Sequence, residues 1–351
     1  MSAPTTGRID GIDLLRGIAI ALVMLRHAWP SAFPGAGVVG VVMFFALSGS
    51  LITGLLVDEL ERTGRVDLRR FYARRARRLV PALLFLVAGV VVVTLLLDPL
   101  GDRGELGTTV LVALTWTANL PFGHASDATF HLWTLATEEQ FYLVWPAVLV
   151  VAFARGRVRL ALVVVAAACV LACVATLVWL SEAPDLAYAL PTSWAVCFVI
   201  GGATRILGAR AADPSSGSAR TGVARYDGLA RRAAPAALVG LAVLSVVPLR
   251  GHALTYLAGG PAIAVLTAVL LLSWRSWTTV TGPARALVVL GTVSYGAYLW
   301  NYPLTLWLRP SLEQYAGPVA AVLTLVMAVI SWRLVERPAQ RWRRTREAVV
   351  A

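Results

Sequence analysis

Long apolar runs alternate with short polar segments along almost the whole chain. Each run is close to the roughly 20 residues that an α-helix needs to cross the hydrocarbon core of a bilayer. The ten runs that we predict to be membrane spans are 12–30, 38–57, 79–97, 131–153, 159–180, 191–207, 235–249, 256–274, 286–308 and 317–333. The pattern therefore predicts an all-α fold, a polytopic transmembrane helical bundle of about ten spans.

Composition supports a multi-pass protein of the cell membrane. Of the 351 residues, 58% are hydrophobic and 14% are charged, whereas a soluble domain carries roughly 25% charged residues. The first apolar run has no small-residue cleavage site before the next run, so we expect an uncleaved first helix and no signal peptide. The stretch 208–234 is rich in Gly, Ser, Ala and Arg, which indicates a cytoplasmic linker within a single transmembrane domain covering 1–351.

The arginines predict the topology, because cytoplasmic loops of membrane proteins carry most of the positive charge. A shorter apolar segment, 107–121, decides how they distribute. If this segment does not cross, the arginine-rich loops all lie on one side, and the opposite loops hold only Arg103, Arg250 and Arg309. We therefore predict that both termini are cytoplasmic. The segment 107–121 is then interfacial or re-entrant, and its backbone must be covered by protein or line a wet cavity.

Residue usage excludes several classes of function. All 31 basic residues are arginine, which excludes a lysine Schiff base and a Walker A loop. The net charge of +12 lies in the segments between apolar runs, so it indicates topology and not a nucleic-acid partner. Cys169, Cys173 and Cys197 lie inside apolar runs and are typical of packing residues. We expect neither a metal site nor a disulfide framework.

Ionisable residues at membrane depth are costly and are usually functional, and the first predicted helix carries Asp13, Arg16, Arg26 and His27. Arg16 and His27 share one helix face about 16 Å apart, and Asp13 lies one turn from Arg16, where it can hold the guanidinium. The simpler interpretation is that Arg16 sets topology and that His27 packs against a carbonyl. Arg26 beside His27 favours a neutral ring, which is the form that acts as a base.

The fourth predicted span begins with the sequence HLWTLATEEQFYLVWP. His131 and Glu138 share a face about 10 Å apart in depth. One of the adjacent carboxylates Glu138 and Glu139 can be structural, paired with an arginine of another helix, while the other lines a cavity. We predict that Glu138 meets His27, and we include His131, Glu139 and Tyr142 as supporting residues.

Two further motifs are candidates for binding and packing. In the loop RRFYARRARRLVP, the arginines at 74, 75 and 78 form either a positive-inside anchor or a site for a polyanion on the cytoplasmic face, for which a nucleotide-bearing acyl donor is a natural ligand. In VVMFFALSGSLITG, Ser48 allows close helix approach around a small polar group. Ser48 lacks a Gly two residues before it, so it is not a nucleophile elbow.

Six motifs in order resemble those of the acyltransferase-3 family of bacterial membrane O-acyltransferases. They are IDLLRGIAIALVMLRH with its Arg-x10-His spacing, FFALSGSLI, FYARRARRLVPAL, HLWTLATEEQFYLVWP, SYGAYLWNYPL and SWRLVERP. The resemblance implies ten transmembrane helices and a cytoplasmic acyl-CoA, commonly acetyl-CoA, as donor substrate, with no permanently bound cofactor. It implies an acceptor hydroxyl on an envelope carbohydrate, a glycolipid or a metabolite.

The resemblance also implies roles for single residues: Arg16 and His27 in catalysis with Glu138 beside them, and Arg74, Arg75 and Arg78 at the donor. Two positions depart from the family pattern: Asn301 stands where the family usually has His, and Thr134 replaces Ser. Some members carry an added esterase-like domain that this chain lacks, so we expect it to act alone or with a separate extracytoplasmic partner.

These residues give a mechanistic hypothesis in which His27 is the general base on the acceptor hydroxyl, or forms an acyl intermediate. Glu138 would orient His27, and Arg16 would stabilise the donor charge or the oxyanion. The competing class is a transporter or flippase for a lipid-linked sugar, although the chain shows no inverted repeat. A membrane sensor or scaffold is a third alternative. Only the enzyme releases the thiol of CoA.

Overall fold

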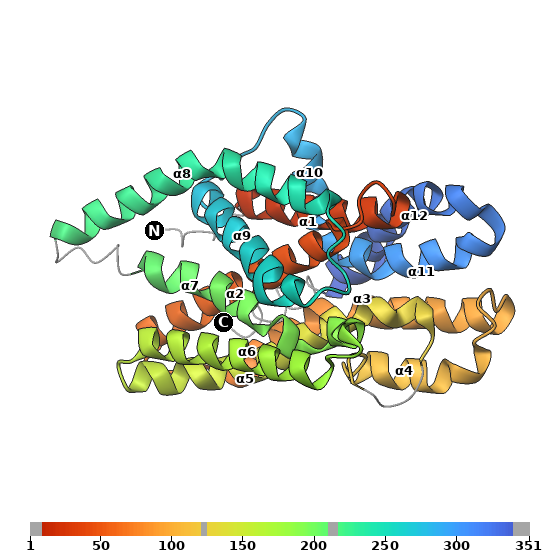
Figure 1. Ribbon diagram of the computed structural model, residues 1–351, viewed down its shortest axis with the longest axis horizontal. Coiled ribbons are helices and arrows are strands. Elements are labelled where there is room, and N and C mark those ends of the chain that lie inside the picture. The colour runs from red at the N-terminus through yellow and green to blue at the C-terminus, as the bar shows by residue number, and fades with distance from the viewer. Residues whose placement is uncertain (1–8, 121–124, 210–216, 340–351) are drawn as a thin grey trace. The chain divides into compact units, whose positions relative to one another are not determined.

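The computed structural model describes residues 9–120, 125–209 and 217–339, and within them every regular element is a helix (Figure 1). The α-helices are α1 (Asp10–Ala28), α2 (Ala36–Thr63), α3 (Leu68–Leu96), α4 (Leu106–Leu114), α5 (Trp133–Ala154), α6 (Val158–Trp179), α7 (Ala195–Ala209), α8 (Gly217–Val246), α9 (Gly260–Trp274), α10 (Ala284–Thr292), α11 (Ser294–Leu312) and α12 (Ala316–Ile330). A 3-10 segment, η2 (Asp127–Leu132), precedes α5, and a π-helical segment, η8 (Ser331–Glu336), continues α12.

The all-helical membrane fold is confirmed. The described residues contain six helical stretches that are long and apolar enough to cross a membrane: Ala36–Thr63, Leu68–Leu96, Val158–Trp179, Asp227–Val246, Thr255–Trp274 and Ser294–Ala339. Each of the ten predicted spans contains a helix, but the number ten and the cytoplasmic placement of the termini stay predictions. Apolar composition alone does not give the number of spans. Helix α1 is not among the six apolar stretches, because its 19 residues include Asp10, Asp13, Arg16 and Arg26.

In the segment 107–121, the described residues 107–120 form part of a short helix and a turn. Helix α4 has 9 residues, and at 1.5 Å per residue it covers about 14 Å, roughly half of the hydrocarbon core. After it, Trp116 adopts a positive φ of 52°, and the chain turns. The Asn119 Nδ2 donates to Gln140 Oε1 at 2.9 Å, and the Gln140 Nε2 donates to Asn119 Oδ1 at 3.0 Å. This reciprocal amide pair ties the turn to α5.

The cytoplasmic linker predicted over 208–234 stays a prediction, and residues 210–216 lie outside the described part of the chain. From Gly217 onward the stretch is helical, as part of α8. The sequence after Gly217 is rich in Ala and Arg, which are good helix formers. The Arg275 Nη2 donates to Asp227 Oδ1 at 2.7 Å, so the helix is tied to the end of α9.

The chain divides into two compact units, each built from separated stretches of sequence. The first contains Met1–Arg26, Ser31–Arg65 and Phe141–Thr292, and the second contains His27–Pro30, Val66–Gln140 and Val293–Ala351. Neither unit is a continuous piece of chain, and helices α1 and α5 contribute residues to both. That 1–351 forms a single domain therefore stays a prediction.

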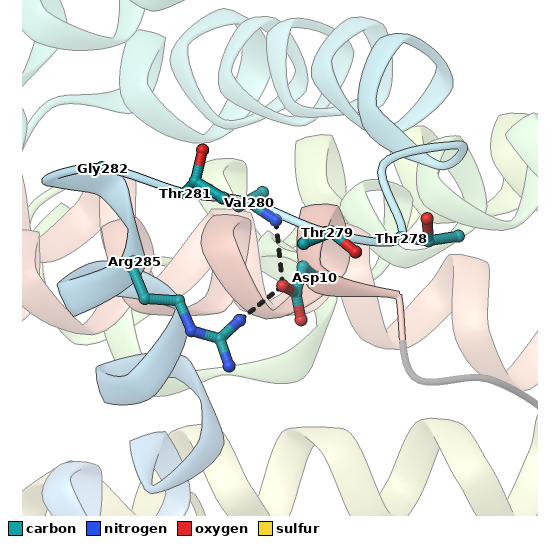
Figure 2. Close-up of a pocket in the computed structure, with 7 residues that line it drawn as sticks. All are labelled: Asp10, Thr278, Thr279, Val280, Thr281, Gly282 and Arg285. Carbon is teal, nitrogen blue, oxygen red and sulfur yellow. Dashed lines mark hydrogen bonds and ion pairs between the residues drawn. The ribbon is translucent and has the colours of Figure 1, made fainter.

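The first unit is held by close helix contacts and by polar bonds between helices and loops. Gly49 of α2 lies against the backbone of Phe198 in α7, where a Cβ atom would collide. The Arg205 guanidinium binds Asp58 at 2.7 Å. At the start of α1, Asp10 Oδ2 accepts from Val280 N at 3.0 Å and from Arg285 Nη1 at 2.5 Å, within a pocket lined by the 278–282 turn (Figure 2). This carboxylate stabilises the helix N-terminus and fixes where α1 begins.

The second unit packs α3 and α11 around an apolar core. Leu86 and Leu299 are fully buried, and the Trp300 indole is 4% exposed. Gly89 of α3 lies directly against the Trp300 ring. Gly317, in the first turn of α12, lies against the backbone of His27 and Ala28. The last residues of α1 are therefore part of the α11–α12 packing.

Candidate functional site

His27 is the penultimate residue of α1 and is half-buried. Its Nδ1 atom lies 2.6 Å from Oδ1 of Asn301, a residue of α11 that is 1% exposed. On the other side, a Cβ atom added to Gly317 would lie 2.6 Å from the His27 carbonyl oxygen, so only glycine allows α12 this close. Side chain and backbone of His27 are thus both held by the second unit.

The Asn301 amide is itself held by α12. Its Nδ2 atom donates to Thr324 Oγ1 at 3.1 Å. The Thr324 hydroxyl donates to the carbonyl oxygen of Ala320 at 2.6 Å, one turn earlier on the same helix. Thr324 and Ala320 are both fully buried. A line of hydrogen bonds therefore runs from the backbone of α12 to the imidazole of His27.

The aromatic ring of Tyr302 lies against two of the described histidines, His27 and His131. The centroid of the Tyr302 ring lies 5.2 Å from that of His27, in an edge contact, and 5.3 Å from that of His131. His131 is 5% exposed, and neither of its ring nitrogens meets a hydrogen-bond partner among the described residues. Burial of an imidazole without partners is costly, so His131 is a candidate for contact with a bound molecule or water.

Hydroxyl groups fix the start of α5 beside His131. The Thr134 Oγ1 and Tyr298 hydroxyl lie 2.5 Å apart. The Tyr298 hydroxyl also donates to the backbone carbonyl of His131 at 2.9 Å. Thr134 therefore keeps the hydrogen-bonding hydroxyl that Ser would supply at this position.

The carboxylates of α5 lie among the arginines of α3. The Arg75 Nη2 donates to Glu139 Oε1 at 2.9 Å, and the two side chains are 17% and 16% exposed. Glu139, one of the two adjacent carboxylates, therefore pairs with an arginine of another helix. Arg75, which we predicted to bind the acyl donor, therefore also forms an ion pair within the protein. Arg74 is half-buried and Arg78 is exposed.

Sequence reasoning missed two polar residues of the same unit. The Tyr295 hydroxyl donates to the carbonyl of Leu79 at 3.1 Å, and its charged neighbours are Glu139, Glu336, Glu138 and Arg78. Glu336 is 4% exposed and accepts a hydrogen bond from Ser331 at 3.0 Å. The signal for Glu336 was present, because a carboxylate at the end of an apolar run is costly to bury.

The remaining predicted residues belong to the first unit. Arg16 and Asp13 are half-buried in α1, and Arg16 lies eleven residues before His27 on the same helix. Ser48 is half-buried in α2, next to the close approach at Gly49. Tyr142 of α5 is 2% exposed and forms an edge contact with the ring of Phe141.

The structure places the Oδ1 atom of Asn301 at Nδ1 of His27. The sequence hypothesis that Glu138 orients the His27 ring stays a prediction. The hydrogen bond to His27 therefore gives Asn301 a structural role, which the absence of the usual His at this position did not indicate. Within the described residues, no group of three or more His, Cys, Asp or Glu side chains can hold a metal ion.

The comparisons with known proteins agree with the six family motifs of the sequence. The family model described as Acyltransferase domain matches residues 9–335. The chain is 26% identical over 382 aligned positions to the peptidoglycan O-acetyltransferase OatA of Listeria monocytogenes, covering 95% of this chain and 55% of that protein. It is 28% identical over 396 positions to the putative peptidoglycan O-acetyltransferase YrhL of Bacillus subtilis, covering 94% of this chain and 54% of that protein.

A shorter match is stronger in identity. The O-acetyltransferase OatA of Staphylococcus aureus is 36% identical over 159 residues, which are 43% of this chain and 26% of that protein. No solved structure matches the chain. The chain thus spans about half the length, or less, of these curated relatives. With the family model matched from residue 9 to residue 335, this multi-pass membrane protein belongs to the acyltransferase-3 family.

Proposed function

We propose that this protein is a membrane O-acyltransferase that transfers an acyl group, most simply acetyl, from cytoplasmic acyl-CoA to a hydroxyl of a cell-envelope carbohydrate. Family membership over residues 9–335 and relatives named peptidoglycan O-acetyltransferases support this class of reaction and acceptor. The observation that carries the proposal is His27. It is a half-buried histidine at a helix end whose Nδ1 is held at 2.6 Å by Asn301, as a general base must be.

In the proposed reaction, His27 removes the proton of the acceptor hydroxyl as its oxygen attacks the thioester carbonyl. The carbon–oxygen bond forms, the carbon–sulfur bond breaks, and the proton on His27 passes to the leaving thiolate, so that an ester and free CoA result. A two-step route with an acyl group on His27 gives the same products. Both routes need the ring nitrogen that Asn301 does not hold.

The charged residues have separate roles in this proposal. The arginines at 74, 75 and 78 bind the phosphates of the donor, because guanidinium groups match phosphate geometry. Since Arg75 is paired with Glu139 and Arg78 is exposed, we expect Arg78 to contribute more of the donor affinity than Arg75. Arg16 stabilises negative charge on the donor or the oxyanion, and Glu138 stabilises the protonated form of His27. Asp13 supports Arg16.

The test measures acetyl-CoA binding and thiol release by the purified protein in nanodiscs. We expect His27→Ala to bind the donor and to lose thiol release on the order of 100-fold or more. We expect the double variant Arg74→Ala/Arg78→Ala to lose donor binding. Matched controls are His252→Ala and Arg309→Ala, at exposed positions. Wild-type rates in the two site variants would overturn the proposal. Movement of a lipid-linked sugar without any thiol release would favour the transporter.

A further inference from the structure

The hydrogen bonds from α12 to His27 have a defined direction. Thr324 has a single hydroxyl proton, and it is donated to the carbonyl oxygen of Ala320 at 2.6 Å. Towards Asn301 the Thr324 oxygen can therefore only accept. The Asn301 atom that faces it at 3.1 Å must be the amide nitrogen. The two ends of the Asn301 amide are thus distinguished by chemistry as well as by position.

The same direction continues to the imidazole. With its nitrogen towards Thr324, the Asn301 amide presents its oxygen to His27 Nδ1 at 2.6 Å. An amide oxygen is only an acceptor, so Nδ1 must carry a proton. A neutral imidazole has one protonated nitrogen, which leaves the lone pair on Nε2. The carbonyl of Ala320 therefore determines, through two side chains, which nitrogen of His27 is basic.

We propose that Asn301 and Thr324 are positioning residues that hold His27 in the Nδ1-protonated tautomer, so that Nε2 takes the proton of the acceptor hydroxyl. This inference rests on the proposed function, and it adds to it the identity of the reacting atom. A flipped amide would present its nitrogen to Nδ1 and make Nδ1 the acceptor. It would also oblige the Thr324 hydroxyl to leave the Ala320 carbonyl.

Burial makes the amide hard to flip. Asn301 is 1% exposed and Thr324 is fully buried, so a flipped arrangement has little access to water that could replace lost hydrogen bonds. Helix α12 also holds the His27 backbone through Gly317, seven residues before Thr324 and hence on the same helix face. One face of α12 therefore sets both the position of His27 and its tautomer.

The chemistry of the amide suits this task. Asn cannot gain or lose a proton in the relevant pH range, whereas a histidine at position 301 could present either nitrogen to His27. With Asn301 the proton on Nδ1 of His27 follows from the fixed hydroxyl of Thr324. The departure from the usual residue of the family is then a second way to orient the same imidazole.

The experiment reads the tautomer directly. The full chain is labelled with 15N-histidine, placed in nanodiscs, and its ring nitrogens are observed by NMR. The chain has only 4 histidines, so His27 is assigned by comparison with His27→Gln. The variants are Thr324→Val, which removes the hydroxyl at nearly the same volume, Asn301→Leu, and the conservative control Thr324→Ser. Thiol release from acetyl-CoA is measured on the same samples, and thermal unfolding shows that each variant is folded.

We expect His27 of the wild type and of Thr324→Ser to show a protonated Nδ1 and an unprotonated Nε2, with equal thiol release. Thr324→Val mixes the two tautomers and lowers thiol release roughly tenfold, and Asn301→Leu lowers it on the order of 100-fold. A protonated Nε2 in the wild type, or an unchanged spectrum in Thr324→Val, overturns the inference. A protonated Nδ1 in a wild type that releases no thiol supports the tautomer assignment and overturns the proposed function instead.

Discussion

Gly317 allows α12 to touch the end of α1, and its replacement by alanine tests whether that contact places His27. A Cβ atom at residue 317 would lie 2.5 Å from Ala28 Cα and 2.6 Å from the His27 oxygen, whereas real Cβ contacts under 3.0 Å essentially never occur. The atoms that it meets are backbone, so the helices must separate by roughly 1 Å. A displacement of that size can lower a rate on the order of 100-fold.

We expect Gly317→Ala to lower the stability only modestly, although it lowers the rate strongly. Overpacking of a tight contact costs about 1–3 kcal/mol, which lowers the unfolding temperature but leaves most of the protein folded. The matched control is Gly107→Ala in α4, where no atom lies within 4 Å of the added Cβ. We expect that control to be neutral or slightly stabilising, because alanine favours a helix.

The assay for both variants combines thermal unfolding in nanodiscs with thiol release at a temperature well below the transition. We expect Gly317→Ala to lose much more rate than the fraction of unfolded protein explains. The reasoning is refuted if Gly317→Ala and Gly107→Ala have the same rate and the same unfolding temperature. A second check is the distance-sensitive hydrogen bond of His27 to Asn301, whose NMR signal should shift in Gly317→Ala alone.

Three further predictions follow from side chains of the second unit. Glu139→Gln removes the negative charge that pairs with Arg75 and should lower the free energy of unfolding by about 1–3 kcal/mol, measured by thermal unfolding; equal stability would show that the 2.9 Å ion pair contributes nothing. His131→Phe should keep or raise stability, since it removes buried ring nitrogens that have no hydrogen-bond partner in the described structure, yet it should lower thiol release about tenfold; an unchanged rate would exclude contact with substrate. Tyr295→Phe removes the bond to the Leu79 carbonyl and should cost about 0.5–1.5 kcal/mol, and a neutral effect in the same unfolding assay would contradict this.

The sequence predicted the elements of this site better than its contacts. His27 and Glu139 stood out because a titratable group is costly inside an apolar run, and that cost is readable from sequence. Asn301, which pairs with His27 across 274 positions of chain, showed only as a departure from a family motif. Thr324 gave no signal, because a hydroxyl in an apolar helix can bond its own backbone wherever it lies.

For the fold, too, the elements were predicted better than the contacts between them. Long runs of apolar residues predicted the helices, because hydrophobic length is a local property. The helical structure of 217–234 within α8 was not predicted, because the Gly and Ser residues of 208–234 indicated a linker, although the Ala-rich sequence favours a helix. The short α4 was expected not to cross, and its 9 residues agree with that. The two interleaved units depend on contacts between distant stretches, which hydropathy does not record.

The amide pair of Asn119 and Gln140 also constrains the order of events during synthesis. Asn119 leaves the ribosome before Gln140, so the Asn119 amide lacks its Gln140 partner until α5 has been made. Until then its polar groups need water or the insertion machinery, since lipid offers them no hydrogen bonds. The turn after α4 therefore matures only with α5, and a chain arrested between residues 120 and 140 should remain sensitive to proteases at this turn.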